Sequence, residues 1–127
     1  MILSKDIILS LPRTPFHRTK TLKKKPGIYF FISNDKVWYV GMTTNFNKRF
    51  YSHHLYKEYI VCADATISIL PFKMDPGSKR HQLYLLAIER AYIYKFKPED
   101  NGTSGEAISI EKLKKIAKEI EIDYSII

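Results

Sequence analysis

Cysteine and long apolar runs are nearly absent from this sequence. Cys62 is the only cysteine, so an internal disulfide and a zinc site built on several cysteines are both excluded. No stretch approaches the ~18 apolar residues that a membrane-spanning helix needs, and the amino terminus lacks a basic segment followed by an apolar signal core. We therefore expect a cytoplasmic protein, in which Cys62 is a small buried residue after Ile60 and Val61.

Acidic residues are scarce in the first 26 positions. Seven basic residues and one acidic residue, Asp6, give this segment a net charge of +6, out of +8 for the whole chain. One interpretation is an arm that follows a phosphate backbone, because lysine and arginine bind phosphates without contacting bases. The other is a solvated arm that packs Ile7, Ile8 and Leu11 on the domain. The candidate nucleic-acid-binding residues are Arg13, Arg18, Lys20, Lys23, Lys24, Lys25 and, further along the chain, Lys48.

Length and composition fit one folded domain. With 127 residues, 45% of them apolar, the chain is long enough for a single core and too short for a catalytic unit plus a separate recognition domain. We expect residues 1–25 to form a basic extension and residues 26–127 to form the domain, with a last helix that covers the core.

Runs of β-branched and aromatic residues predict a small sheet. Residues 27–33 and 37–41 are two such runs, and residues 34–36 between them are typical of a tight turn in an antiparallel pair. Residues 59–62 also have the composition of a strand, and residues 65–72 alternate and supply the third strand. The predicted fold class is α+β, a three-stranded, mainly antiparallel sheet flanked by helices.

Four segments have the capping residues and periodicity of helices. They are a short helix from Ser4 to a stop near Pro12, residues 45–56 with Phe46 and Phe50 buried, residues 79–96, and residues 110–122 with Ser109 as cap.

The second of these helices brings polar side chains to the predicted hairpin. Arg49 and His53 are four positions apart, so we expect them to share one helix face. That face lies beside the strands that carry Tyr29 and Tyr39. The sequence therefore predicts a cluster of two phenols, a guanidinium and an imidazole.

Glu89 places a carboxylate in the apolar face of the long helix. Its neighbours three and four positions away are Leu85, Leu86, Tyr92 and Ile93. An ionised carboxylate in such surroundings needs a partner, because burying it unpaired is costly. A structural ion pair with lysine or arginine is one solution. The predicted polar cluster favours the other, a role in a functional site.

Two tripeptides frame the predicted hairpin. Gly27-Ile28-Tyr29 is followed, after nine residues, by Tyr39-Val40-Gly41. The residues that complete the pattern downstream are Arg49, His53, Glu89 and Asn101. In this order and spacing, roughly residues 26–101 resemble the GIY-YIG nuclease family.

The resemblance implies a GIY-YIG-like nuclease domain that hydrolyses DNA phosphodiesters with a divalent metal. Glu89 matches the family's metal ligand, and a single carboxylate with several waters suits Mg²⁺ or Mn²⁺. We expect Arg49 to stabilise charge in the transition state and Tyr39 to hydrogen-bond phosphate or water. Asn101 either orders the site, as its family counterpart does, or bonds the turn backbone before Gly102.

Two residues compete for the attacking water. Tyr29 is the first candidate to position or deprotonate it, since nearby positive charge lowers the pKa of a phenol. His53 is the rival, with a better unperturbed pKa. His54 points about 100° further around the helix, so we expect it at the surface.

The expected partner is double-stranded or branched DNA, with no membrane. Targeting then comes from the amino-terminal arm, from a homodimer or from a partner protein, because the chain has no room for a recognition domain. Two other functions stay open. One is a nucleic-acid-binding module that keeps the fold but does not cut, and the other is a small-molecule or structural role in which the basic arm is incidental.

Overall fold

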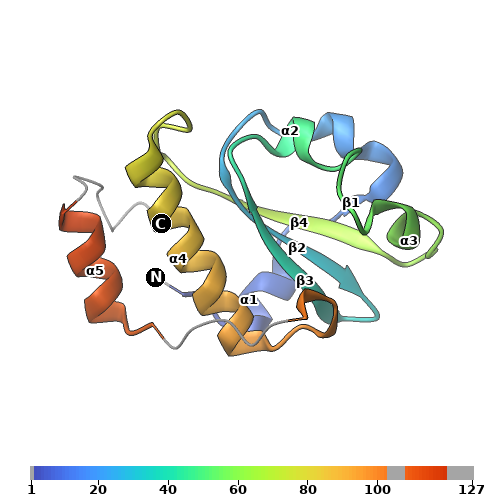
Figure 1. Cartoon of the computed structure of the whole chain (residues 1–127). Helices are drawn as coiled ribbons and strands as arrows, with labels where there is room; N and C mark the ends of the chain where they lie inside the picture. The colour runs from blue at the N-terminus through green and yellow to red at the C-terminus, as the bar shows by residue number, and fades with distance from the viewer. Residues whose placement is uncertain (1, 103–107, 120–127) are drawn as a thin grey trace.

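The computed structural model describes residues 2–102 and 108–119 and places one antiparallel sheet between two helical layers (Figure 1). Along the chain the elements, with η marking a 3-10 helix, are α1 (Lys5–Ser10), β1 (Thr14–Pro15), η1 (Phe16–Thr21), β2 (Gly27–Ser33), β3 (Lys36–Thr43), α2 (Phe46–Arg49), α3 (Tyr56–Ile60), β4 (Thr66–Pro71), α4 (Lys79–Phe96), η2 (Glu99–Asn101) and α5 (Ile110–Glu119).

The sheet has four strands in the order β1-β4-β2-β3, and every neighbouring pair is antiparallel. The α+β class and the antiparallel pairing agree with the prediction, but the expected number of three strands is wrong. The missed strand, β1, is only two residues long, too short to show the alternation that reveals a strand. It lies at the sheet edge, where Pro15 is tolerated because it has no N–H to pair.

The predicted hairpin is present as β2 and β3. Asn34 and Asp35 form its turn with φ of 56° and 53°, the left-handed conformation that two-residue hairpin loops require. A bulge follows, because Phe31 pairs with Tyr39 while Ile32 pairs with Val37. Trp38 is thus an extra residue on β3, and both Trp38 and Tyr39 pack on the same side of the sheet.

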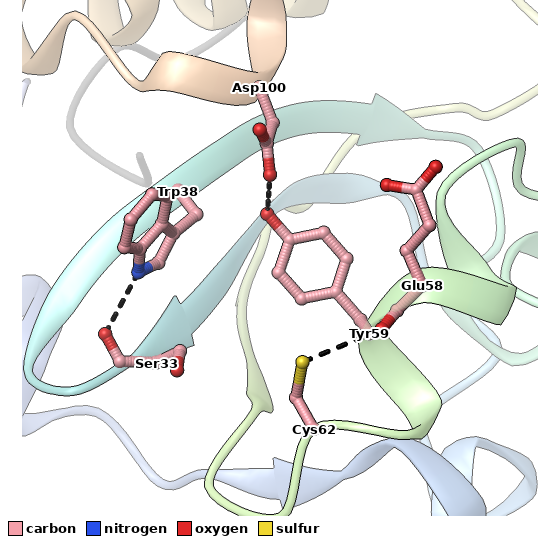
Figure 2. Close-up of a pocket in the computed structure, with 6 residues that line it drawn as sticks. All are labelled: Ser33, Trp38, Glu58, Tyr59, Cys62 and Asp100. Carbon is pink, nitrogen blue, oxygen red and sulfur yellow. Dashed lines mark hydrogen bonds between the residues drawn. The ribbon is translucent and has the colours of Figure 1, made fainter.

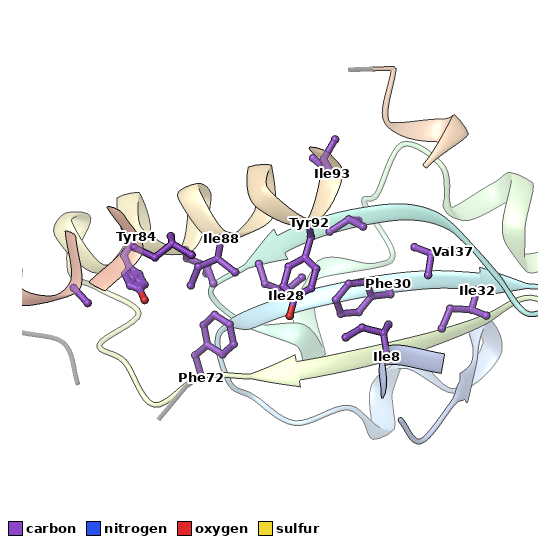
Figure 3. Packing of buried hydrophobic residues seen from close by; sticks show 14 residues of the cluster. Ile8, Ile28, Phe30, Ile32, Val37, Phe72, Tyr84, Ile88, Tyr92 and Ile93 are labelled. Atoms are coloured by element: carbon purple, nitrogen blue, oxygen red, sulfur yellow. The ribbon is translucent and has the colours of Figure 1, made fainter. Parts of the chain in front are cut away.

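Each face of the sheet buries its own core. The core under α4, α1 and α5 (Figure 3), here called the α4-face core, consists of Ile8, Ile28, Phe30, Ile32, Val37, Val40, Phe72, Tyr84, Leu85, Ile88, Tyr92, Ile93, Leu113 and Ala117. The core under η1, α2 and α3, here called the α2-face core, consists of Phe16, Leu22, Tyr29, Phe31, Phe46, Phe50, Tyr59, Ala65 and Ile67. Alternation along β2 divides its residues between them, which puts Tyr29 on the α2 face.

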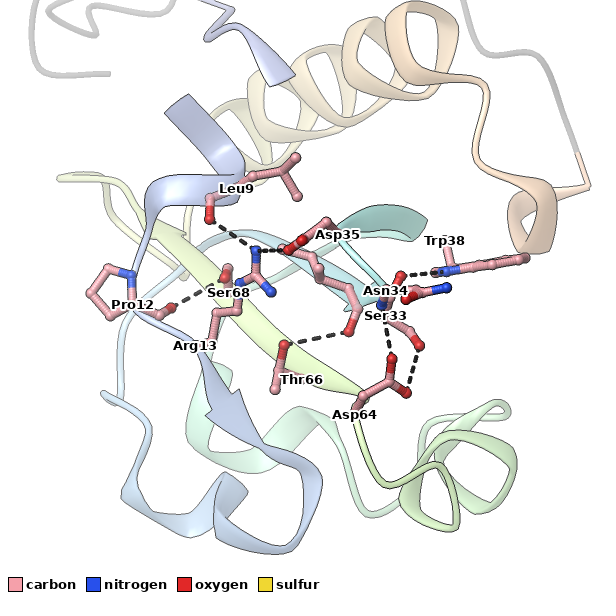
Figure 4. A network of polar contacts seen from close by, with 11 residues as sticks. Leu9, Pro12, Arg13, Ser33, Asn34, Asp35, Trp38, Asp64, Thr66 and Ser68 are labelled. Carbon is pink, nitrogen blue, oxygen red and sulfur yellow. Dashed lines mark hydrogen bonds and ion pairs between the residues drawn. The ribbon is translucent and has the colours of Figure 1, made fainter. Parts of the chain in front are cut away.

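The amino-terminal segment packs on both faces. Ile8 on α1 is fully buried in the α4-face core, Leu11 packs beside it, and Ile7 is largely exposed. Polar contacts tie the same segment to the hairpin tip (Figure 4). Arg13 donates to Leu9 O at 3.1 Å and forms an ion pair with Asp35 at 3.0 Å. The division of the chain at residue 25 stays a prediction.

The predicted helix over residues 45–56 is wrong in length. It is two short helices, α2 and α3, with a turn between them. Asn45 caps the first, accepting from Asn47 N at 3.0 Å. Before α3, the His53 Nδ1 atom accepts a hydrogen bond from Leu55 N at 3.1 Å. A local side-chain bond of this kind competes with the backbone bonds that would continue the helix from α2.

The strand expected at residues 59–62 is also wrong. Tyr59 and Ile60 belong to α3, whose Tyr59 ring is drawn into the α2-face core, so tertiary packing overrides their β propensity. Cys62 follows the helix and is exposed, not buried as expected.

The later helices match their predictions. α4 has the expected ends, with Ser78 as its cap and Lys97 in the left-handed conformation at its end. Ser109 caps α5, accepting from Lys112 N at 3.1 Å. Residues 120–122 of that predicted helix lie outside the described residues. No helix within the described ranges is long and apolar enough to cross a membrane.

Candidate active site

Tyr29 lies across the hairpin because its partner on β3 is a glycine. Tyr29 pairs with Gly41, where a Cβ atom would overlap the Tyr29 ring and hydroxyl. The ring is 1% exposed and receives the edge of Phe50, with 4.9 Å between centroids. The position of the phenol oxygen is therefore set by core packing, and Gly41 is needed for it.

A chain of hydrogen bonds leads from Arg49 toward solvent. The Arg49 guanidinium donates to the Tyr29 hydroxyl, and Tyr29 donates to the oxygen of Tyr39, which is only half-buried. Arg49 is the last residue of α2, and α2 is anchored by the bond from Phe46 N to Lys25 O at 3.0 Å. Tyr29, Tyr39 and Arg49 thus come together, as the sequence predicts.

Both phenols hold their protons strongly. Burial raises the pKa of Tyr29 well above its usual range, and the nearby Arg49 charge offsets only part of that effect. Burial and the Glu89 charge likewise raise the pKa of Tyr39. At neutral pH the pair therefore consists of hydroxyl groups that donate and accept hydrogen bonds.

His53 reaches the cluster by a different route from the one expected. The expectation that Arg49 and His53 share a helix face is wrong, because α2 ends at Arg49 and a turn follows. In that turn His53 N donates to Phe50 O at 3.0 Å. The imidazole still lies edge-on to both tyrosines, with ring centroids 5.7 Å from Tyr29 and 5.0 Å from Tyr39.

The hydrogen bonds of His53 fix its tautomer. Its Nδ1 atom accepts from Leu55 N, so in the neutral ring the proton resides on Nε2. That Nε2 atom is buried and has no hydrogen-bond partner within the described residues. Burial, then the Arg49 charge, lower the pKa of His53 to about 3. The residue is thus a neutral imidazole with an unused N–H donor.

Glu89 faces the same cluster from α4. Its carboxylate accepts a hydrogen bond from the backbone N–H of Met42, at the far end of β3. Burial raises the pKa of Glu89. The hydrogen bond from Met42 and the positive charges of Arg90 and Arg49 lower this pKa, but their effect is smaller than that of burial. The charge of Glu89 in turn raises the pKa values of Tyr29 and Tyr39, so the carboxylate acts electrostatically on both phenols.

The donor set limits which metal this place suits. Within the described residues, no three His, Cys, Asp or Glu side chains gather to form a complete metal site. A lone carboxylate does not suit zinc, which takes three or four protein ligands. It does suit a hard divalent cation such as Mg²⁺, which keeps several waters and shares the oxygens of a substrate phosphate. Glu89 therefore fits a metal that is held jointly by protein and substrate.

Asn101 supports the site from outside. Its Oδ1 atom accepts from Val40 N at 2.9 Å, and its Nδ2 atom donates to Val40 O at 2.8 Å. These bonds fix β3 at Val40, the residue that follows Tyr39. The amide does not bond the turn before Gly102, which was the alternative interpretation.

The candidate basic residues fall into two groups. Lys20 and Lys25 lie beside α2, because Asn47 Nδ2 donates to Lys20 O at 2.8 Å and Phe46 N donates to Lys25 O. Lys48 lies on α2 itself, and the other exposed lysines of the connecting segment are Lys23, which also lines a pocket with Pro12 and Ile69, and Lys24. Arg18 is exposed on η1, and Arg13 is at the hairpin tip in its ion pair with Asp35.

Two features of the site escaped the analysis of residue types. His54 is exposed as expected, yet it stacks on His53 at 4.6 Å and meets Tyr39 at 5.8 Å. Gly41 is the other, since its function is to leave space for Tyr29. The pairing register of the hairpin, with Tyr29 opposite Gly41, is the signal that reveals it.

The comparison with protein families agrees with this geometry. Residues 25–118 match the model of the GIY-YIG catalytic domain. The chain belongs to the GIY-YIG family. The GIY-YIG match includes Tyr29, Tyr39, Arg49, His53, Glu89 and Asn101, and it places the chain among nucleases. The match begins after η1, so α1, β1 and η1 lie outside it. Searches of curated proteins and of solved structures gave no match.

Proposed function

We propose that this GIY-YIG protein is a divalent-metal-dependent endonuclease that hydrolyses DNA phosphodiesters by attack of water. The observation that carries the proposal is the convergence of Glu89 with the hydrogen-bonded chain of Arg49, Tyr29 and Tyr39. A structural role for Glu89 alone does not call for two phenols and a guanidinium around a buried carboxylate.

Glu89 is the residue that holds Mg²⁺ or Mn²⁺. When bound, such a metal polarises a phosphoryl oxygen and stabilises the leaving alkoxide. Met42 N–H, by bonding the carboxylate, fixes its orientation. Arg49, at the end of α2, stabilises negative charge on the phosphate in the transition state through its planar set of donors.

Tyr29 and Tyr39 position the attacking water. The bond from Arg49 occupies the Tyr29 oxygen and orients its proton toward Tyr39, which leaves the half-buried Tyr39 hydroxyl to meet water or phosphate. His53 is a poorer base in this arrangement, because Nδ1 is occupied by Leu55 N–H. Its free Nε2–H is suited to donate to a phosphate oxygen instead. Tyr29, which keeps its own proton, therefore acts by orienting Tyr39 and the attacking water, and His53 acts by donating to phosphate.

DNA is proposed to lie along the edge formed by α2 and the lysines beside it. Lys20 and Lys25, whose carbonyls are bonded by α2 residues, and Lys48 on α2 add positive charge beside α2, and Lys23 and Lys24 continue the run along the chain. Such charge binds the phosphates of double-stranded or branched DNA without reading their sequence. The alternative function is that of a GIY-YIG module that binds DNA but does not cleave it.

Cleavage by a Glu89→Gln variant tests the proposal. Supercoiled, linear, branched and single-stranded DNA, and RNA, are incubated with wild type and variant in Mg²⁺, Mn²⁺ or EDTA. Glutamine keeps the shape but removes the charge, so we expect cleavage to disappear while DNA binding and the folded circular dichroism spectrum remain.

Glu111→Gln is the matched control, because Glu111 is an exposed glutamate on α5. It should cut like wild type. Wild-type protein that binds every substrate and cuts none in either metal establishes the binding module. Equal cutting by Glu89→Gln and wild type across a Mg²⁺ titration rejects Glu89 as the metal ligand.

A further inference from the structure

A pocket of about 250 Å³ opens on the α2 side of the hairpin tip (Figure 2). Its lining residues are Ser33, Trp38, Glu58, Tyr59, Cys62 and Asp100. Pockets for drug-sized ligands measure roughly 300–1,000 Å³. This one therefore has room for a single small group, such as one side chain.

Two aromatic rings form its walls, and both are held in place. Trp38 is the residue of the β-bulge, and its indole N–H donates to Ser33 O at 3.0 Å. The Tyr59 ring stacks on Phe16 with 5.4 Å between centroids, and its hydroxyl donates to Asp100. In Figure 2 the two rings stand on either side of the opening. The pocket is thus formed before any ligand arrives.

The charge around the pocket is opposite to that of the chain as a whole. Glu58 and Asp100 line it, and both are exposed. Asp64 adjoins it, since Asp64 accepts from the Ser33 hydroxyl at 2.9 Å. The cation that adjoins it, Lys36, lies over the Trp38 ring at 4.3 Å and is paired with Glu99 at 2.7 Å. In a protein of net charge +8, this is a local acidic site.

We propose that the pocket between Trp38 and Tyr59 binds an arginine side chain of a partner protein. A guanidinium stacks on aromatic rings through its flat face and pairs with carboxylates through its edge, and both features are present here. The carboxylates of Glu58 and Asp100 repel phosphate. They disfavour a nucleobase for the same reason, because a nucleotide carries its phosphates to the pocket together with the base. The contact of Lys36 with Trp38 shows that the indole accepts a cation.

This site goes beyond the proposed nuclease function. It uses none of Tyr29, Tyr39, Arg49, His53 or Glu89, and its charge is opposite to that of the lysine edge beside α2. A basic segment bound there would leave that edge open to DNA. The partner would tether the nuclease while DNA occupies the lysine edge.

The chain contains two natural probes of the pocket. Trp38 is the only tryptophan and Cys62 the only cysteine, and both line it. Tryptophan fluorescence of the full chain is titrated with the capped tripeptide Gly-Arg-Gly, with Gly-Gln-Gly, with spermidine and with dGMP. In parallel, the rate at which maleimide labels Cys62 is measured with each compound. Neither readout depends on cleavage, so failure here and failure of the nuclease proposal are separate results.

We expect the arginine tripeptide to change the fluorescence saturably and to slow labelling of Cys62, while Gly-Gln-Gly does neither. Glu58→Gln and Asp100→Asn should each weaken the binding by at least about 10-fold, the effect of losing one charge-assisted hydrogen bond. Glu111→Gln should bind like wild type. Glu58→Gln is the decisive variant, because Asp100→Asn also alters the bond to Tyr59.

Three results would overturn the proposal. They are a saturable response to dGMP without one to the arginine tripeptide, a response to spermidine alone, and an arginine affinity that Glu58→Gln leaves unchanged.

Discussion

The two faces of the sheet bury cores of different chemistry. The α4-face core is built mainly from aliphatic side chains and closes under one long helix. The α2-face core is mainly aromatic, and its cover is made of short pieces, η1, α2 and α3. Tyr29 is a core residue on this second face and also a site residue. The helix over the aliphatic core carries Glu89 on its partly buried surface, while the aromatic core includes a site residue, Tyr29, among its own members.

This difference shows how the site is held. A long helix positions Glu89 from one side, but Arg49 and His53 lie on short segments that have little stability of their own. Those segments depend on contacts such as Phe46 N to Lys25 O and on the packing of Phe50 against Tyr29. Substitutions on the two faces should therefore have separable effects.

Among the substitutions in the α2-face core, Tyr29→Phe should have the largest effect. It removes only the oxygen that links Arg49 to Tyr39, so the fold should remain while the single-turnover cleavage rate falls by about 10²-fold, the cost of misplacing a reacting group. Rapid-quench assays with saturating enzyme measure this rate.

His53→Gln is the comparison for Tyr29→Phe and should lose less activity, because His53 lacks a free acceptor nitrogen. The reverse ranking, with near-normal cleavage by Tyr29→Phe and none by His53→Gln, would assign the base to His53.

Leu113→Ala should affect stability without affecting chemistry. Leu113 on α5 is fully buried in the α4-face core, so the cavity should lower the free energy of unfolding by about 2–5 kcal/mol. Urea titration measures the change. At a temperature where the variant is folded, its single-turnover rate should equal that of wild type; a slower rate would show that the two faces are coupled.

Replacing Lys23, Lys24 and Lys25 by alanine should weaken DNA binding in a salt-dependent way. The slope of log affinity against log salt should flatten by up to about 0.9 for each phosphate that the variant no longer neutralises. Arg13→Ala is the control, since Arg13 is already paired with Asp35 and should change the slope less. An unchanged slope in the triple variant would exclude this edge from DNA binding.

Burial of a neutral His53 should also make the stability of the fold depend on pH. The pKa of His53 is lowered from 6.5 to about 3, so between these values the unfolded chain binds a proton that the folded protein does not. The free energy of unfolding should therefore fall as pH falls through this window, by up to about 1.4 kcal/mol per pH unit from this residue. Urea titrations from pH 4 to 7 should show a shallower fall for His53→Gln than for wild type.

His17→Gln, which removes an exposed histidine on η1, is the control for that measurement. Equal slopes for wild type and His53→Gln would contradict the burial of a neutral His53.

The sequence predicted best where a pattern extends over many residues. α4 has no glycine or proline over 18 residues and lies where expected, and the hairpin is marked by its turn. The misses are short elements. β1 is too short to show an alternation of apolar and polar residues. Residues 45–62 include aromatic residues whose backbone conformation depends on how they pack in the α2-face core.

The site was predictable to a similar extent. Tyr29, Tyr39, Arg49 and Glu89 do converge, because the hairpin and α4 fix most of their positions. The directions of the pKa shifts were not predictable. Nearby positive charge was expected to lower the pKa of Tyr29, but burial raises it further, and burial is a property of the folded chain that the residue order does not display.

The bonds from Asn101 to Val40 also bear on how the protein avoids self-association. β3 is an edge strand, and an exposed edge can recruit a strand from another molecule into a growing sheet. By occupying both the N–H and the C=O of Val40, the Asn101 amide takes the place that an incoming strand would need. The opposite edge is β1, a two-residue strand ending in proline, which gives a second chain almost nothing to pair with. At Val40 on one edge and at Pro15 on the other, the sheet thus offers no free backbone group to a second strand.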